Sequence, residues 1–159
     1  MPIVDLNDYE HGPWLLFRGW QVAPTDNLTG ATATVQWANK KILMRRSAWD
    51  RPSARVLRYV MLHEIVHAIH AETTGGRYDC DELQAARRLD RRSAVEAIAD
   101  GACLMLDTSS VMRAWVRASV IWHGRVGYRY RWADVVHPVT RQTVLRLLDA
   151  TRPTGALSA

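Results

Sequence analysis

Apolar and polar residues alternate early in the chain. Between residues 31 and 38, alanine, valine and tryptophan occupy every second position, with threonine and glutamine between them. Such alternation is typical of a half-buried β-strand. Asn39 and Lys40 suit a tight turn, and residues 41–45 can return as a second strand. The pattern predicts a β-hairpin over about residues 31–45.

Helical patterns follow the hairpin. Nothing breaks a helix between about residues 52 and 72, and two glycines then end it. A second helix is expected at about residues 93–107, and a basic, helical C-terminal part at 111–150. We therefore expect an α+β fold: a single, mainly helical domain over residues 1–150. A small antiparallel sheet or hairpin should pack against the first long helix, and residues 151–159 should form a flexible tail.

The first long helix carries the sequence H-E-I-V-H at residues 63–67. Residues four apart lie about 40° apart around a helix and about 6 Å apart along it, so His63 and His67 share one face. Two imidazoles placed in this way can share one Zn²⁺. Glu64, between them, can take a proton from a metal-bound water and pass it to a leaving group. This is the signature of zinc metalloproteases.

A catalytic zinc site needs a third protein ligand. Glu96 is the best candidate, since Asp100 follows it by one helical turn and can fix the orientation of a ligand histidine. His70 lies too far along the helix from His63 to share one ion. Cys80 follows the helix and could approach the site. The alternative for Glu96 is a structural role, because Ser93-x-x-Glu96 also has the form of a helix capping box.

The chain resembles the ImmA/IrrE-type metallopeptidases in three stretches. These are the strand pair, the helix ending Y-V-M-L-H-E-I-V-H-A-I-H with the later E-A-I-A-D-G-A-C, and the C-terminal P-V-T-R-Q-T-V-L-R-L-L. The resemblance covers about residues 31–150. It implies a small gluzincin, a zinc peptidase with a downstream glutamate ligand. It further implies limited proteolysis of a protein substrate, a helix-turn-helix transcriptional repressor.

These residues together predict a zinc-dependent endopeptidase. His63, His67 and Glu96 would hold the zinc, Glu64 would be the general base, and Asp100 would orient a ligand histidine. The tetrahedral oxyanion needs a further donor. Four residues after position 122 could supply that donor: His123, Tyr128, Tyr130 and His137. Of these, we predict His123 and Tyr128. The hairpin, around residues 35–44, would hold the substrate as an added strand.

Charge suggests a second class of function. The net charge is +5, and residues 111–159 hold 8 basic and 2 acidic side chains. Residues 133–150 resemble a helix-turn-helix, beside arginines that alternate with aromatic residues, so nucleic acid is a candidate partner. The alternatives are therefore a DNA-binding regulator, or an SprT-like peptidase acting on DNA-bound proteins. In the SprT-like case His123 or His137 would replace Glu96 as the third ligand.

Two cysteines do not make a disulfide framework, and no stretch reads as a signal peptide. No apolar run approaches the length of a membrane span. We expect a cytoplasmic protein with no membrane partner. A gluzincin fold without activity, used for protein binding, is disfavoured because Glu64 is intact.

Overall fold

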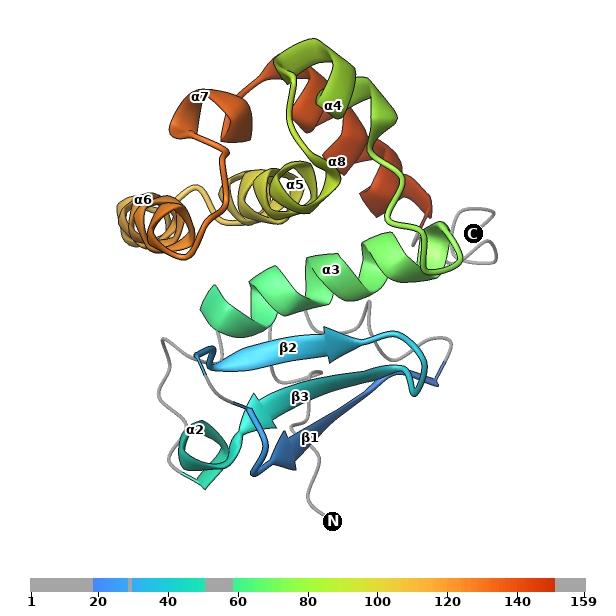
Figure 1. Cartoon of the computed structure of the whole chain (residues 1–159), viewed down its shortest axis with the longest axis vertical. Coiled ribbons are helices and arrows are strands. Elements are labelled where there is room, and N and C mark those ends of the chain that lie inside the picture. Colours follow the sequence, from blue (N-terminus) through green and yellow to red (C-terminus); the bar gives the residue numbers. More distant parts are fainter. Residues whose placement is uncertain (1–18, 29, 51–58, 151–159) are drawn as a thin grey trace. The chain divides into compact units, whose positions relative to one another are not determined.

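The computed structural model describes residues 19–28, 30–50 and 59–150 (Figure 1). The chain divides after Gly76 into two compact units. The first holds a small sheet with helices α2 (Arg46–Asp50) and α3 (Met61–Thr73), and the second is helical. This confirms a mainly helical α+β fold. A single domain spanning both units stays a prediction, and the expected tail at 151–159 and helix start at 52–58 lie outside the described residues.

The sheet has three strands in the order β1-β3-β2, formed by β1 (Gln21–Thr25), β2 (Ala33–Gln36) and β3 (Lys41–Arg45). Strands β2 and β3 are antiparallel, and Gln36 pairs with Lys41 at the end next to the turn. The turn closes with a hydrogen bond from the backbone N–H of Lys40 to the carbonyl of Trp37, at 3.1 Å. The hairpin lies within the stretch in which the alternating sequence predicted it.

Of the expected antiparallel sheet or hairpin, the hairpin is confirmed, but the sheet is mixed, because β1 pairs with β3 in parallel, from Gln21 opposite Lys41 to Thr25 opposite Arg45. Pro24 belongs to β1, at the edge of the sheet, where a residue without an N–H donor is tolerated. Strand β1 does not pair with the next strand in the sequence, so no turn motif between two adjacent strands indicates this pairing.

Helix α3 is buried along most of its length: every residue from Met61 to Ala71 is buried. It packs against β2 and β3 (Figure 1). Val60, just before it, is already helical, with φ −66° and ψ −45°. The helix ends where Gly75 and Gly76 adopt positive φ angles of 61° and 82°, a conformation that glycine adopts without strain.

The C-terminal end of α3 is fixed to the sheet side of its unit by Glu72. One carboxylate oxygen of Glu72 accepts a hydrogen bond from the indole N–H of Trp20 at 3.0 Å, and the other lies 3.3 Å from Nζ of Lys40. At Gly76, a Cβ atom would come within 2.5 Å of the Trp37 indole, so glycine is required there for packing as well as for its φ angle. These contacts hold α3 in register with the β2–β3 turn.

The second unit is built around α5 (Arg91–Leu106), which packs against α4, α6, α7 and α8. These helices are α4 (Asp81–Arg87), α6 (Ser110–Arg125), α7 (Trp132–Val135) and α8 (Pro138–Ala150). Small residues on α5 allow close approach: Ala94, Ala97, Ala99 and Ala102 are fully buried. The helix expected at about 93–107 corresponds to α5.

Asp134 joins three of these helices. Its Oδ1 accepts a hydrogen bond from Nε of Arg87 at 2.6 Å, and its Oδ2 accepts one from the N–H of Arg131 at 2.8 Å. The hydroxyl of Thr140 donates to the backbone carbonyl of Asp134 at 2.6 Å. This arrangement places Thr140 and the end of α7 against Gly101 of α5.

Substitution of Gly101 by alanine should destabilise the second unit. The new Cβ would lie 2.8 Å from Cγ2 of Thr140 and 3.0 Å from the carbonyl oxygen of Val135. We expect a loss of about 1–3 kcal/mol in the free energy of unfolding, as overpacked cores show, measured by urea denaturation.

Gly124→Ala is the matched control, since a Cβ there meets nothing within 4 Å and the position is helical. Its stability should be unchanged or higher by up to about 1 kcal/mol, because alanine is the better helix former. Equal stabilities for the two variants would contradict the close packing of α5 against α7 and α8.

Candidate functional site

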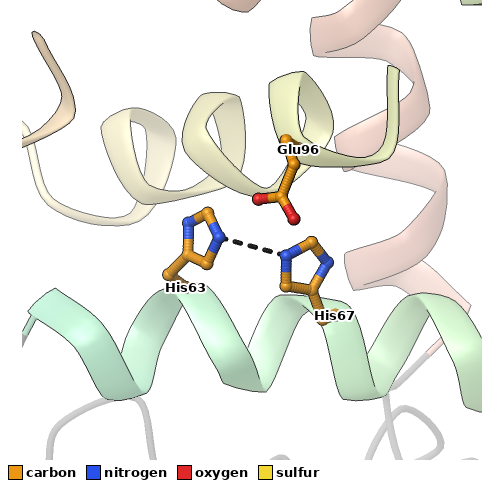
Figure 2. Close-up of side chains that lie close together, drawn as sticks. All are labelled: His63, His67 and Glu96. Carbon is orange, nitrogen blue, oxygen red and sulfur yellow. Dashed lines mark hydrogen bonds between the residues drawn. The ribbon is translucent and has the colours of Figure 1, made fainter. Parts of the chain in front are cut away.

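The two histidines of the H-E-I-V-H motif face each other on α3. Their Nε2 atoms lie 3.0 Å apart, and the rings are nearly perpendicular, at 83° (Figure 2). Both side chains are largely buried, with exposures of 6% for His63 and 7% for His67. The structure therefore brings together the pair that the four-residue spacing predicted. Glu64 lies between them on the same buried stretch of α3, and His70 is buried one turn after His67.

Glu96 lies on α5 of the second unit (Figure 2). The capping-box alternative for this residue is wrong. The N-cap of α5 is Asp90, whose side chain accepts a hydrogen bond from the N–H of Ser93 at 3.2 Å. Ser93 is thus inside the helix, and Glu96 lies beyond its first turn. Oε2 of Glu96 lies 3.5 Å from Nε2 of His123.

Asp100, one turn after Glu96, is completely buried and receives hydrogen bonds from two hydroxyls. The Tyr130 hydroxyl donates to its Oδ2 at 2.6 Å, and the Ser119 hydroxyl lies 3.3 Å and 3.4 Å from its two oxygens. Both hydroxyls also contact Nδ1 of His123, at 2.7 Å from Tyr130 and 3.3 Å from Ser119. The role predicted for Asp100, orienting a ligand histidine of α3, stays a prediction.

Of the two tyrosines near His123, the structure gives the hydroxyl contact to Tyr130 and a ring contact to Tyr128. The Tyr128 ring lies edge-on to the His123 ring, with centroids 4.9 Å apart. Its own face is covered by the guanidinium of Arg92, 4.1 Å from the ring centre. Tyr128 is the tyrosine predicted from the sequence as an oxyanion donor, with Tyr130 among the other candidates. The alternation of residues 126–132 places both tyrosines on one side of an extended segment and cannot separate them.

The segment that carries these tyrosines is held to α5 by Ser93. Its buried hydroxyl accepts a hydrogen bond from the N–H of Arg129 at 2.9 Å. Burial, and then the neighbouring Asp100 carboxylate, raise the pKa of Tyr130 far above its usual value, so its hydroxyl keeps its proton. The second unit therefore gathers Asp100, Ser119, His123 and Tyr130 into one hydrogen-bonded group, with Glu96 beside Nε2 of His123.

Two other candidates have hydrogen-bond partners within the second unit. Burial raises the pKa of the Cys80 thiol to about 11, and its sulfur lies 3.4 Å from Oε1 of Gln84. His137 accepts a hydrogen bond on Nδ1 from the N–H of Val139 at 3.1 Å, at the start of α8.

The helix-turn-helix-like stretch at 133–150 contains α7 and α8, of which α7 spans only four residues. Helix α8 buries Thr140, Thr143, Val144 and Leu147. On its exposed side, Arg146 forms an ion pair with Glu82 of α4, with an N–O distance of 3.1 Å. DNA contact by this region stays a prediction.

Comparison with known proteins returned no match: no family model, no curated protein and no solved structure is significantly similar to this chain. In the described part of the chain, no helix has the length and apolar content needed to cross a lipid bilayer.

Removal of the Ser93 hydroxyl should loosen the segment of residues 126–131. Ser93→Ala leaves the N–H of Arg129 without the partner that it has in the native structure. We expect a loss of about 1 kcal/mol in stability, the typical contribution of one hydrogen bond. Amide hydrogen exchange should also become faster at Arg129.

Ser110→Ala, at the exposed start of α6, serves as the control, because Ser109 rather than Ser110 caps that helix. It should leave both stability and exchange at Arg129 unchanged. Unaltered exchange at Arg129 in Ser93→Ala would show that the segment is held by other contacts.

Proposed function

We propose that this protein is a zinc-dependent endopeptidase. The observation that carries the proposal is the histidine pair of α3, whose Nε2 atoms approach to 3.0 Å on a buried helix face, with Glu64 between them in sequence. Two nitrogens bound at about 2.1 Å to one tetrahedral zinc lie about 3.4 Å apart, so a small adjustment of the rings would suit the ion.

The third ligand in this proposal is Glu96. Imidazole nitrogens from His63 and His67 and a carboxylate oxygen from Glu96 are donor atoms that zinc takes in hydrolases. The proposal is supported by the Asp90 cap of α5, which removes the competing explanation for a carboxylate at position 96. The alternative with His137 as the third ligand is weaker, because its Nδ1 accepts the N–H of Val139 and the neutral ring then carries its proton on Nε2. A hydrogen bond at Nδ1 of His123 is compatible with a metal bond through Nε2, and the variants below test that alternative.

In such a site the bound zinc would supply Lewis-acid polarisation of the scissile carbonyl and of the attacking water. Glu64 would take the proton of that water and deliver it to the leaving amine. His123, from the second unit, would stabilise the developing negative charge on the carbonyl oxygen through Nε2. Tyr128 would contribute by packing against the His123 ring. Asp100 would support the site from behind.

The substrate would be a protein segment in extended conformation, added to β2. Strand β3 lies in the middle of the sheet and cannot accept another strand, so only part of the predicted 35–44 hairpin is suitable. The N–H of Arg45 donates to the carbonyl of Thr32, and in an antiparallel pair every second residue from there bonds to the neighbouring strand. The main-chain N–H and C=O groups of Ala33 and Val35 therefore point away from β3. The resemblance to ImmA/IrrE-type peptidases suggests a helix-turn-helix repressor as the substrate.

Glu64→Gln should retain zinc and lose hydrolysis. The amide keeps the size of the side chain but cannot act as a base, and loss of a general base lowers rates by roughly 10²- to 10⁴-fold. Zinc content would be measured by mass spectrometry of the purified protein and activity with fluorescently labelled casein. Full activity in the variant would refute the assignment of Glu64.

Glu96→Ala should weaken zinc binding. Loss of a direct ligand should exceed the roughly 10- to 100-fold effect of losing an outer hydrogen-bond partner. Affinity would be measured by competition with a chromophoric chelator.

Glu82→Ala, which removes an exposed carboxylate of α4, is the matched control and should bind zinc as the wild type does. His123→Ala and His137→Ala test the other ligand sets. If either of these abolishes zinc binding while Glu96→Ala does not, Glu96 is not the third ligand.

A further inference from the structure

The hydrogen bonds around His123 have a direction that can be derived from donor and acceptor chemistry. A carboxylate has no proton to give, so the Tyr130 hydroxyl, 2.6 Å from Oδ2 of Asp100, donates to it. A tyrosine hydroxyl has a single proton. The same oxygen also lies 2.7 Å from Nδ1 of His123, and it can only accept there. Nδ1 of His123 must therefore carry a proton.

The Ser119 hydroxyl supports the same direction. It donates to the Asp100 carboxylate at 3.3 Å and 3.4 Å, and it lies 3.3 Å from Nδ1 of His123. Once its single proton is used on Asp100, it too can only accept from the ring. Two hydroxyls thus link one carboxylate to one ring nitrogen, and Tyr130, only 3% exposed, makes the shorter contacts.

We propose that Tyr130 is a positioning residue, which with the Asp100 carboxylate keeps a proton on Nδ1 of His123 and turns Nε2 toward Glu96. Nδ1–H donates to the Tyr130 oxygen, and Tyr130 donates to Asp100. Nε2 is then the ring atom through which His123 acts, 3.5 Å from Oε2 of Glu96.

The catalytic meaning of this arrangement rests on the proposed peptidase function, but the position of the proton does not. In solution a neutral histidine exchanges its proton between the two ring nitrogens, and in a protein the hydrogen bond at one nitrogen decides which form is present. In His123, the hydrogen bond that decides the form is made at Nδ1 by a tyrosine hydroxyl and not directly by a carboxylate. Loss of that hydroxyl should therefore release the ring without removing the buried charge.

The test is a long-range ¹H–¹⁵N correlation spectrum of the full-length ¹⁵N-labelled protein, recorded at a pH where the His123 ring is neutral. His123→Gln assigns the signals. The wild type should show the Nδ1–H form. In Tyr130→Phe, the ratio of Nδ1–H to Nε2–H should fall roughly tenfold, as expected for the loss of about one hydrogen bond. It should fall further in Tyr130→Phe combined with Ser119→Ala.

Tyr128→Phe is the matched control, because it keeps the ring that packs on His123 and removes only a hydroxyl. It should keep the wild-type ratio. A wild-type ring in the Nε2–H form, an unchanged ratio in Tyr130→Phe, or an equal change in Tyr128→Phe would each overturn the proposal.

If Tyr130→Phe does not fold, Asp100→Leu provides the second measurement, since leucine has no acceptor for the Tyr130 and Ser119 protons, which can then be donated to Nδ1 of His123 and shift the ring proton toward Nε2. An unchanged ratio in Asp100→Leu would overturn the proposal as well. Zinc content and casein hydrolysis, measured separately, show whether the peptidase proposal fails on its own.

Discussion

Burial of ionisable side chains on otherwise apolar helices is the constraint on which the candidate site depends. Helix α3 buries two facing histidines and Glu64 among aliphatic residues, and α5 buries Asp100 completely. A charged or polar group in such surroundings destabilises the fold unless it is hydrogen-bonded, paired with an opposite charge or bound to a metal. The contacts of these residues are therefore requirements of the fold as well as features of a site.

In the second unit, this requirement organises residues that are distant in sequence. The buried Asp100 carboxylate is satisfied by hydroxyls from α6 and from the segment that follows it. Ser93, two turns earlier on α5, holds the same segment through the N–H of Arg129. The position of the His123 ring follows from both, since it shares the two hydroxyls with Asp100.

In the first unit, the corresponding requirement falls on α3. Its histidine pair is placed by the helix itself, because residues four apart share a face. The position of α3 along the sheet is fixed by other contacts. These are the contacts of Glu72 with Trp20 and Lys40, and the close approach of Gly76 to Trp37. Strand β2 and helix α3 are thereby fixed in one unit, as a peptidase that binds its substrate as an added strand would need.

The sequence alone determined what depends on local spacing. The four-residue interval predicted the facing of His63 and His67, alternation predicted the β2–β3 hairpin, and helix periodicity located α5. Tertiary structure decided what depends on non-local pairing. In the tertiary structure, β1 pairs with β3 in parallel, and Asp90 rather than Ser93 caps α5. The hydroxyl that contacts His123 is that of Tyr130 and not that of Tyr128. The reason is physical: periodicity shows which face of an element a residue occupies, whereas a hydrogen bond between distant segments depends on how the loops that join them close.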